Sequence, residues 1–394
     1  MIRTVPWLAA AVMLVATGAV TACGSSAASS ASGAGAGAGG AASGTASMAT
    51  SIATQADDWA VVPMSSDPAF WEVFERASSS GTWRLVTPPG VADNGGLVAS
   101  AGAATSLTIA VRPSQDLLFS PLAATANGGA SWSTGGPINA AVAASPGAFA
   151  ADGNYLAALL SDGTIETSSD AGATWSPLAK PGAIAASPAA KGCGGAVRVT
   201  SLSFGISSSE VLAGGTCGTS GTTAIFAYSD STGWQRESLP VAGPLVRLGG
   251  GTALVDGKAG LTELAYGFGW YAYAPLTGAT PRPAASGWDA SAALSASGPV
   301  TASGTLPAGG SWVLLSGGRA ATIDGPSPTT SAAKWTLLPP VPAATTVLAA
   351  GPGGAVDALA VSGTTLTVWQ LPPNATAWSK VQAINVPIQP GSSS

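Results

Sequence analysis

The side chains that could carry catalytic chemistry in this chain are its carboxylates, tyrosines and arginines, because none of its 394 residues is histidine. That absence excludes a Ser-His-Asp triad, a Cys-His pair and a zinc site with histidine ligands. Two carboxyl groups about 5–9.5 Å apart could hydrolyse a glycosidic bond. No spacing among the 19 acidic residues marks such a pair. We therefore predict no catalytic residue, no cofactor and no metal ligand.

Charged residues make up only 8% of the chain, and its formal net charge is −5. No stripe of basic residues is present, which argues against a surface that follows the phosphates of a nucleic acid. We therefore expect no nucleic-acid partner.

The N-terminal segment has the order of a secretory signal, with basic Arg3, an apolar run from Trp7 to Val20 and then small residues. Val20-Thr21-Ala22 precedes Cys23-Gly24. This motif resembles the lipobox of bacterial lipoproteins. The resemblance implies removal of residues 1–22, acylation of Cys23 and anchoring to the outer face of the bacterial cytoplasmic membrane. The alternative is a retained transmembrane helix, although the apolar run is shorter than the ~20 residues that a span needs.

Residues 24–47 are glycine, alanine or serine with the exception of Thr45. Such a segment buries too little apolar area to offset its ordering entropy. We assign 23–56 to the acylated cysteine and a flexible linker, whose first 24 residues would reach ~27 Å as a random coil. The folded domain is predicted at 57–390.

The folded part contains many short β-prone runs between turn residues, with 53 glycines and 29 prolines in the chain, which indicates an all-β domain. Residues 168–175 read Ser-Ser-Asp-Ala-Gly-Ala-Thr-Trp, 125–132 are a close copy with asparagine for aspartate, and 229–234 are a shortened copy. These segments resemble the Asp-box (BNR) repeat of sialidase-like β-propellers. In that repeat the polar side chain and the glycine shape a turn, and the tryptophan fills the space between sheets. The corresponding residues are Asn127, Gly129, Trp132, Asp170, Gly172, Trp175, Asp230 and Trp234.

Seven tryptophans recur about every 49 residues, a spacing typical of propeller blades: Trp83, Trp132, Trp175, Trp234, Trp270, Trp335 and Trp378. We predict a β-propeller of about seven four-stranded blades. Six or eight blades stay open, as does a β-sandwich. The sequence pattern is clearest for one blade. We predict its strands at 155–160 and 164–168, an outer strand beginning at Thr174 and the innermost strand near 138–144.

Cys193 and Cys217 remain as a pair if Cys23 is acylated. They flank a hairpin predicted at 197–206 and 211–215, and an oxidising compartment favours a disulfide between them. The enclosed loop of about 24 residues would contribute roughly 3 kcal/mol to stability.

The sialidase family would imply an Arg-Ile-Pro signature, three convergent arginines, a Tyr/Glu nucleophile pair and an acid–base aspartate. The chain has Arg112-Pro113 without the isoleucine. The aromatic run 266–273 offers Tyr271 and Tyr273 as candidate binding residues. Our first hypothesis is a non-catalytic, membrane-anchored propeller that binds a protein or glycan of the cell envelope. The alternatives are an exported sialidase-like glycoside hydrolase and a structural spacer.

Overall fold

The computed structural model divides the chain into two compact units, Met1–Gly44 and Thr45–Ser394. The first unit lies outside the described residues. The structure describes 49–54, 57–64, 71–77, 81–89, 97–103, 105–111, 117–145, 147–267, 270–272, 276–278, 280–281, 299–306, 309–324 and 334–387.

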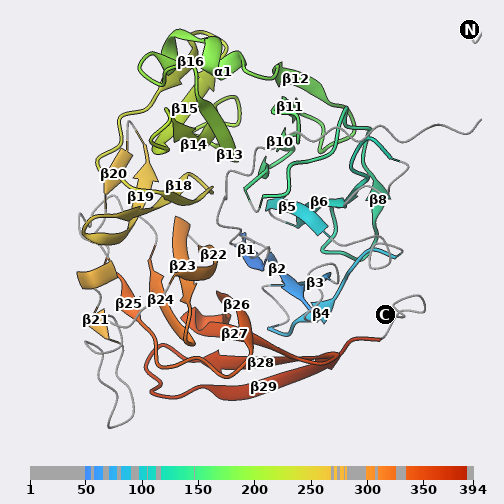
Figure 1. The fold of residues 1–394 in the computed structure, drawn as a ribbon. Helices are drawn as coiled ribbons and strands as arrows, with labels where there is room; N and C mark the ends of the chain where they lie inside the picture. The colour runs from blue at the N-terminus through green and yellow to red at the C-terminus, as the bar shows by residue number, and fades with distance from the viewer. Residues whose placement is uncertain are drawn as a thin grey trace, which may run out of the picture. The chain divides into compact units, whose positions relative to one another are not determined.

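The described part of the second unit is a seven-bladed β-propeller, as the sequence predicts (Figure 1). Each blade is an antiparallel sheet of four consecutive strands, and blade 6 gains a fifth, parallel strand, β21 (Thr280–Pro281). Blades 1 to 4 are formed by β1 (Thr50–Ala53), β2 (Asp57–Pro63), β3 (Trp71–Ala77) and β4 (Arg84–Leu85); β5 (Leu97–Ala103), β6 (Ser106–Val111), β7 (Leu122–Thr125) and β8 (Ser133–Thr134); β9 (Phe149–Asp152), β10 (Tyr155–Leu159), β11 (Ile165–Ser168) and β12 (Ser176–Ala179); and β13 (Val197–Phe204), β14 (Val211–Cys217), β15 (Thr222–Ser229) and β16 (Gly233–Arg236).

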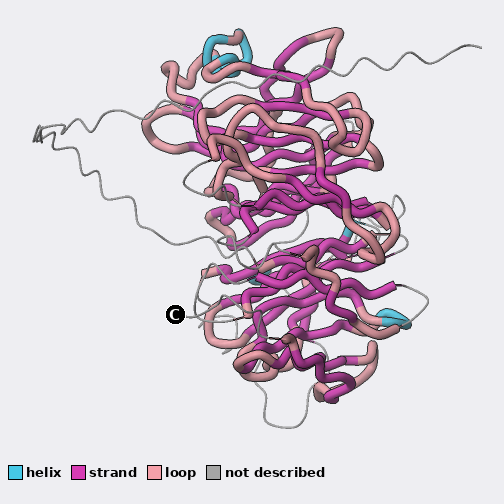
Figure 2. Tube along the Cα trace, turned by 90° about the vertical axis from the view of Figure 1, so that its right-hand side faces the viewer, coloured by secondary structure: helices cyan, strands magenta, loops and turns pink. Residues whose placement is uncertain are grey.

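Blades 5 to 7 are formed by β17 (Leu245–Gly249), β18 (Thr252–Gly257), β19 (Gly260–Tyr266) and β20 (Trp270–Ala272); β22 (Val300–Leu306), β23 (Gly310–Leu315), β24 (Arg319–Ile323) and β25 (Thr336–Leu337); and β26 (Thr345–Ala350), β27 (Val356–Ser362), β28 (Thr365–Leu371) and β29 (Ser379–Asn385). Figure 2 shows how fully strands dominate the unit. Its described helices are single turns: α1 (Ala183–Ala186), η1 (Pro188–Ala190), η2 (Leu276–Gly278) and η4 (Pro352–Gly354).

Two strands lie where the sequence analysis did not place them. The innermost strand of blade 3 is β9, Phe149–Asp152, so the prediction of a strand near 138–144 is wrong. In that segment Val142 forms only an isolated bridge with Leu160, and the turn that follows redirects the chain before pairing can extend. Strand β1 lies within the segment assigned to the linker, because Ile52 pairs with Trp59 and thereby completes blade 1.

The antiparallel pairing defines two faces of the ring. We call the face on which each innermost strand begins the upper face, and the opposite one the lower face. Turns between the second and third strands, and connections between blades, lie on the upper face. Turns between the third and fourth strands lie on the lower face, including the three turns that resemble Asp-boxes. The chain enters blade 1 through Ala49 on the upper face.

Each blade carries one of the seven predicted tryptophans at the start of its outermost strand. Several of these indoles reach back to the preceding blade. Trp132 Nε1 donates to Val86 O at 2.8 Å, and Trp378 Nε1 donates to Pro339 O at 3.3 Å. Some of these indoles therefore couple neighbouring sheets, whereas Trp175 Nε1 donates to Gly172 O within its own turn.

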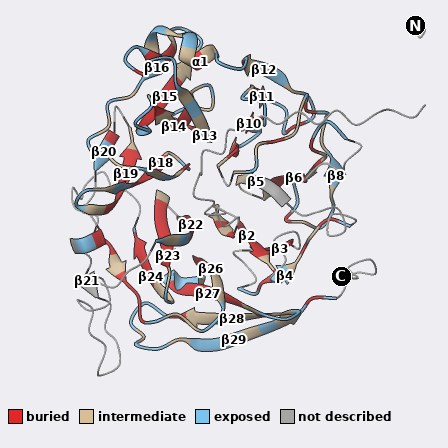
Figure 3. Ribbon diagram, viewed as in Figure 1, coloured by how far each residue is buried: buried red, intermediate tan, exposed pale blue. Residues whose placement is uncertain are grey.

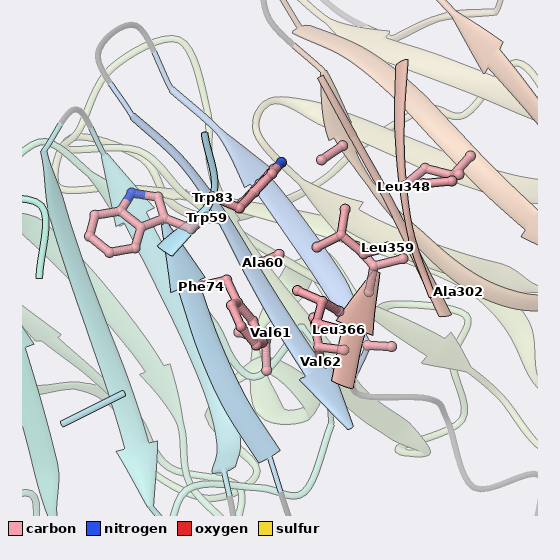
Figure 4. Close-up of a cluster of buried hydrophobic side chains, with 14 of the residues drawn as sticks. Trp59, Ala60, Val61, Val62, Phe74, Trp83, Ala302, Leu348, Leu359 and Leu366 are labelled. Carbon is pink, nitrogen blue, oxygen red and sulfur yellow. The ribbon is translucent and has the colours of Figure 1, made fainter. Parts of the chain in front are cut away.

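No strand is shared between the first and last blades, so side chains close the ring. Trp83 Nε1 donates to Asp357 Oδ2 at 2.9 Å, and Gln382 exchanges two hydrogen bonds with the backbone of Trp83. Arg76 pairs with Asp58 and donates to Ala350 O at 2.6 Å. The largest core cluster continues across this junction, as Figure 4 shows for side chains of blades 1, 6 and 7. Hydrophobic packing and a buried ionic cluster thus hold the closure together.

Candidate functional site

The central channel is the place where a propeller hydrolase would gather carboxylates. The seven innermost strands, as described, contain one acidic residue, Asp152, and two arginines, Arg198 and Arg247. Their other residues are small or apolar. These strands therefore do not supply the pair of carboxylates that glycoside hydrolysis requires.

Strand β1 also lies across the channel instead of only lining it. Thr50 Oγ1 donates to Ser303 O at 2.9 Å, and Trp312 Nε1 donates to Ser51 Oγ at 2.7 Å. A Cβ at Gly304 would lie 2.7 Å from Ser51 O, so glycine is needed for this approach. Figure 1 shows β1 nearest the centre of the ring, beside β22. Contact between blades 1 and 6 therefore narrows the channel.

Three arginines of the described residues, Arg76, Arg84 and Arg247, are held apart by separate partners. Arg247 Nη2 lies 3.1 Å from Glu263 Oε1 and also donates to Ser311 Oγ, which joins blades 5 and 6. Burial raises the pKa of Glu263, against the lowering effect of Arg247 and Ser311. Arg84 pairs with Glu75, and Arg76 belongs to the ring closure. These groups have structural partners. Arg112-Pro113 lies outside the described residues.

The turn at 168–175 has the hydrogen bonds expected from its sequence. Asp170 Oδ1 accepts from Thr174 N at 2.8 Å, and Asp170 Oδ2 accepts from Thr174 Oγ1 at 2.6 Å. Ser168 Oγ donates to Asp170 and accepts from Gly172 N. The Thr174 hydroxyl and amide lower the pKa of Asp170 to about 2. Trp175 covers the turn, with its ring 5.8 Å from that of Phe149.

The second copy, at 125–132, is closed in the same way. Asn127 Oδ1 accepts from Ser131 N at 2.9 Å, and Thr125 Oγ1 accepts from Gly129 N at 3.0 Å. Gly129 has φ +77°, and a Cβ there would lie 2.6 Å from the Val86 side chain. Glycine is therefore required both by the backbone conformation and by the close approach of blade 1.

The shortened copy at 229–234 differs. Its turn is closed by the hydroxyls of Ser229 and Thr232, which lie 2.7 Å apart. Asp230 is exposed beside this contact. Trp234 keeps its place and packs against Tyr228, with ring centroids 5.2 Å apart. This copy is one residue shorter between Asp230 and Trp234 than the full motif is between Asp170 and Trp175. It therefore lacks a residue equivalent to Thr174, whose amide donates to the aspartate in the full motif.

The remaining predicted site residues divide into three cases. Cys193 and Cys217 form a disulfide with Cα atoms 4.8 Å apart, which confirms that prediction. Tyr271 is 57% exposed on the outermost strand of blade 5. Tyr273 and Cys23 lie outside the described residues. Across the described part, no helix is long and apolar enough to cross a membrane, and no three His, Cys, Asp or Glu side chains gather as a metal site.

The site that the structure adds is a hollow on the upper face between blades 3 and 4. It has a volume of about 380 Å³. One wall is the turn Ser161–Gly163, another is the segment that carries α1, and the third is the start of β13. Figure 3 shows that α1 contains exposed residues beside buried ones. The hollow therefore lies on the face opposite the turns that resemble Asp-boxes.

Apolar side chains form the floor of the hollow, and charged groups stand at its rim. Leu160 and Ile184 are buried beneath it. Lys180 and Arg198 are exposed around it. Asp162 Oδ1 is engaged in its own turn, where it accepts from Thr164 N at 2.8 Å. Two cations at the rim of an apolar hollow suit a ligand with an anionic group and an apolar part.

The disulfide stabilises the third wall of this hollow. Cys193 lies in the connection that carries α1 and η1, and Cys217 ends β14 beside the start of β13, where Val197 pairs with Cys217. Arg236 Nη1 approaches Cys193 Sγ at 3.9 Å, so a further cation lies close by. The bond therefore fixes the connection against blade 4.

Sequence reasoning missed the hollow, although a signal for it exists. Residues 171–209 contain Lys180, Lys191 and Arg198 but no acidic residue, in a chain with 19 acidic residues and only 14 basic ones. This local excess of positive charge is diluted in the composition of the whole chain. Only the fold brings Lys180 and Arg198 to one rim.

No protein-family model and no curated protein matches the chain. Among solved structures it is similar to the GH74 xyloglucanase of Xanthomonas campestris, with 14% identity, a TM-score of 0.50 and coverage of 81% of this chain and 51% of that one. A putative 6-phosphogluconolactonase from Bacteroides uniformis is 11% identical, with a TM-score of 0.49 and coverage of 84% and 96%. YCF48 from Cyanidioschyzon merolae is 13% identical, with a TM-score of 0.46 and coverage of 84% and 98%. The chain thus spans about half of the xyloglucanase. At these identities the likeness is one of fold, and the class that fold and strand order define is the seven-bladed β-propeller.

Proposed function

We propose that this protein is an extracytoplasmic lipoprotein that binds a protein or glycan of the cell envelope and does not catalyse a reaction. The observation that carries the proposal is the hollow on the upper face, with an apolar floor and with Lys180 and Arg198 at its rim. A rigid ring of sheets presents such a site without further folding. The ligand would carry a carboxylate or phosphate, because the rim has two cations, Lys180 and Arg198, against one carboxylate, Asp162, which accepts from Thr164 N in its own turn.

Two features support binding over hydrolysis. The described innermost strands contain a single carboxylate, Asp152, and β1 narrows the channel by contacting β22. The alternative, a sialidase-like glycoside hydrolase, would need a further acid from outside these strands. A panel of fluorogenic glycosides tests that alternative, and turnover by the purified protein would overturn the non-catalytic assignment.

The sequence of the leader supports the anchor. Cys23 follows Val20-Thr21-Ala22, and the segment after it is almost wholly glycine, alanine and serine. The mature protein should begin at Cys23 and carry acyl chains that mass spectrometry detects. The Cys23→Ala variant should appear in the soluble fraction of cells, or remain with its leader uncleaved and without acyl chains. Equal acylation of this variant and the native protein would contradict the assignment.

The binding site is tested by reversing one charge. Lys180→Glu should slow the association with anionic envelope glycans or acidic peptides and lower the affinity severalfold at low salt, because it replaces attraction at the rim by repulsion. Lys380→Glu is the matched control, since Lys380 is also exposed but lies on β29 of blade 7. If both variants lose affinity equally, the effect is one of net charge and the hollow is not the site.

A further inference from the structure

A second feature of the upper face is a run of three large apolar side chains. Leu117, Leu118 and Phe119 are consecutive, and they are 36%, 87% and 37% exposed. They lie in the connection from β6 to β7 of blade 2, which is on the upper face because β6 ends there. Adjacent large apolar side chains in water are costly, and such a patch marks a surface that contacts an apolar phase or partner.

The connection is held in place at its inner end. Ser120 is buried, and its Oγ accepts from Val142 N at 2.9 Å. Val111 N donates to Pro121 O at 2.9 Å. The fold therefore fixes the two residues that follow Phe119. We call the exposed side chains of Leu117, Leu118 and Phe119 the apolar tip of blade 2.

The same face carries the positive charge described above. Val142, which donates to Ser120, also pairs with Leu160 at the wall of the hollow. The apolar tip of blade 2 and the cations Lys180 and Arg198 are therefore neighbouring parts of one surface. Residues 171–209 contain Lys180, Lys191 and Arg198 and no acidic residue, and Asp162 is the one carboxylate among the residues that line the hollow.

The chain also enters the propeller on this face. Ala49 leads into β1, whose partner strand and register place its start at the upper end of the ring. The 48 residues before Ala49 include Cys23 and the linker. The anchor that we propose would therefore be joined to the propeller at its upper face.

We infer that the upper face docks on an anionic lipid bilayer, with Leu117, Leu118 and Phe119 inserted at the interface and Lys180, Lys191 and Arg198 against the headgroups. Apolar side chains enter the headgroup–acyl boundary, and nearby basic residues add attraction to anionic lipids. Docking would add to the anchoring by the acyl chains of Cys23 and restrict the ligand of the hollow to groups close to the membrane surface. This inference rests on the proposed anchoring.

The test uses the unit Thr45–Ser394, which lacks Cys23 but contains every core cluster, the disulfide and the ring closure. Co-sedimentation is measured with vesicles of phosphatidylglycerol and phosphatidylcholine in equal parts, and with phosphatidylcholine alone. The unit should bind the anionic vesicles, and Leu118→Asp should reduce that binding by at least about tenfold. Ile206→Asp is the matched control, because Ile206 is 63% exposed on the lower face.

A second variant separates insertion from charge attraction. Lys180→Glu should weaken binding to the anionic vesicles and leave the weak binding to phosphatidylcholine unchanged. Equal binding by Leu118→Asp and Ile206→Asp would overturn the inference. The inference would also be overturned if the native unit did not bind vesicles. That result would be expected if the apolar tip contacted an envelope protein and not the bilayer. Because the unit lacks Cys23, failure to bind vesicles would contradict docking of the upper face but would not bear on the acylation of Cys23, which mass spectrometry tests independently.

Discussion

The closure of the ring by Trp83 yields a prediction in which two tryptophans serve as each other's reference. Trp83 and Trp335 occupy equivalent places at the start of the outermost strand of their blades, and they are 2% and 0% exposed. Trp83 Nε1 donates to the buried carboxylate of Asp357 at 2.9 Å, across the junction of blades 1 and 7. Within the described residues, Trp335 Nε1 has no hydrogen-bond partner.

Replacing each tryptophan with phenylalanine removes a similar volume from a similar environment, so that the cavity contributions largely cancel. Trp83→Phe additionally removes a hydrogen bond to a charged group, which contributes about 1.5–3 kcal/mol. It also weakens the contact between Arg76 and the ring, whose centroid lies 5.5 Å from Arg76 Cζ. The free energy of unfolding should therefore fall by about 2 kcal/mol more in Trp83→Phe than in Trp335→Phe.

Urea denaturation followed by far-ultraviolet circular dichroism measures both variants against the native unit. The slope with urea should be equal among the three proteins, because the surface exposed on unfolding hardly changes. A loss in Trp335→Phe equal to or larger than that in Trp83→Phe would refute the view that this hydrogen bond closes the ring.

Three further predictions concern stability. Burial raises the pKa of Asp58 from 3.8 to about 6, so between these pH values the folded protein keeps a proton that the unfolded chain has released. The free energy of unfolding should therefore fall as the pH rises from about 4 through 6. Asp58→Asn should flatten this dependence when the melting temperature is measured as a function of pH. The double variant Cys193→Ser, Cys217→Ser should lose about 3 kcal/mol of unfolding free energy, and reduction should bring the native unit to the same value without changing the variant. Asp170→Ala should lower the melting temperature measurably because it opens a turn with two bonds to Thr174, whereas Asp230→Ala should leave it unchanged; the reverse order would contradict our description of these turns.

The features that sequence predicted correctly are local. Each blade carries one such tryptophan at the start of its outermost strand, so that one residue type at a regular spacing reports the blade count. The pair Cys193 and Cys217 flanks a single hairpin, whose register is set by neighbouring residues. Such signals need no knowledge of the ring.

The features that sequence missed depend on distant segments. Trp83 and Asp357 are 274 residues apart, and their hydrogen bond exists only because the ring closes. Strand β1 is composed of Thr-Ser-Ile-Ala, which resembles the linker in composition, and it is a strand because β2 and β22 provide partners. The rim of the hollow likewise joins Lys180 to Arg198 through the packing of blade 3 on blade 4.

The measurement that tests most directly whether the upper face is the binding surface is photo-cross-linking of the full chain in intact cells. Ser161→p-benzoylphenylalanine places a reactive group at the wall of the hollow and leaves Lys180 and Arg198 in place. Tyr155→p-benzoylphenylalanine places it on the lower face, where Tyr155 is 41% exposed. We predict a discrete adduct from position 161 and none from position 155. An adduct from position 155 alone, or from neither position, would contradict this prediction.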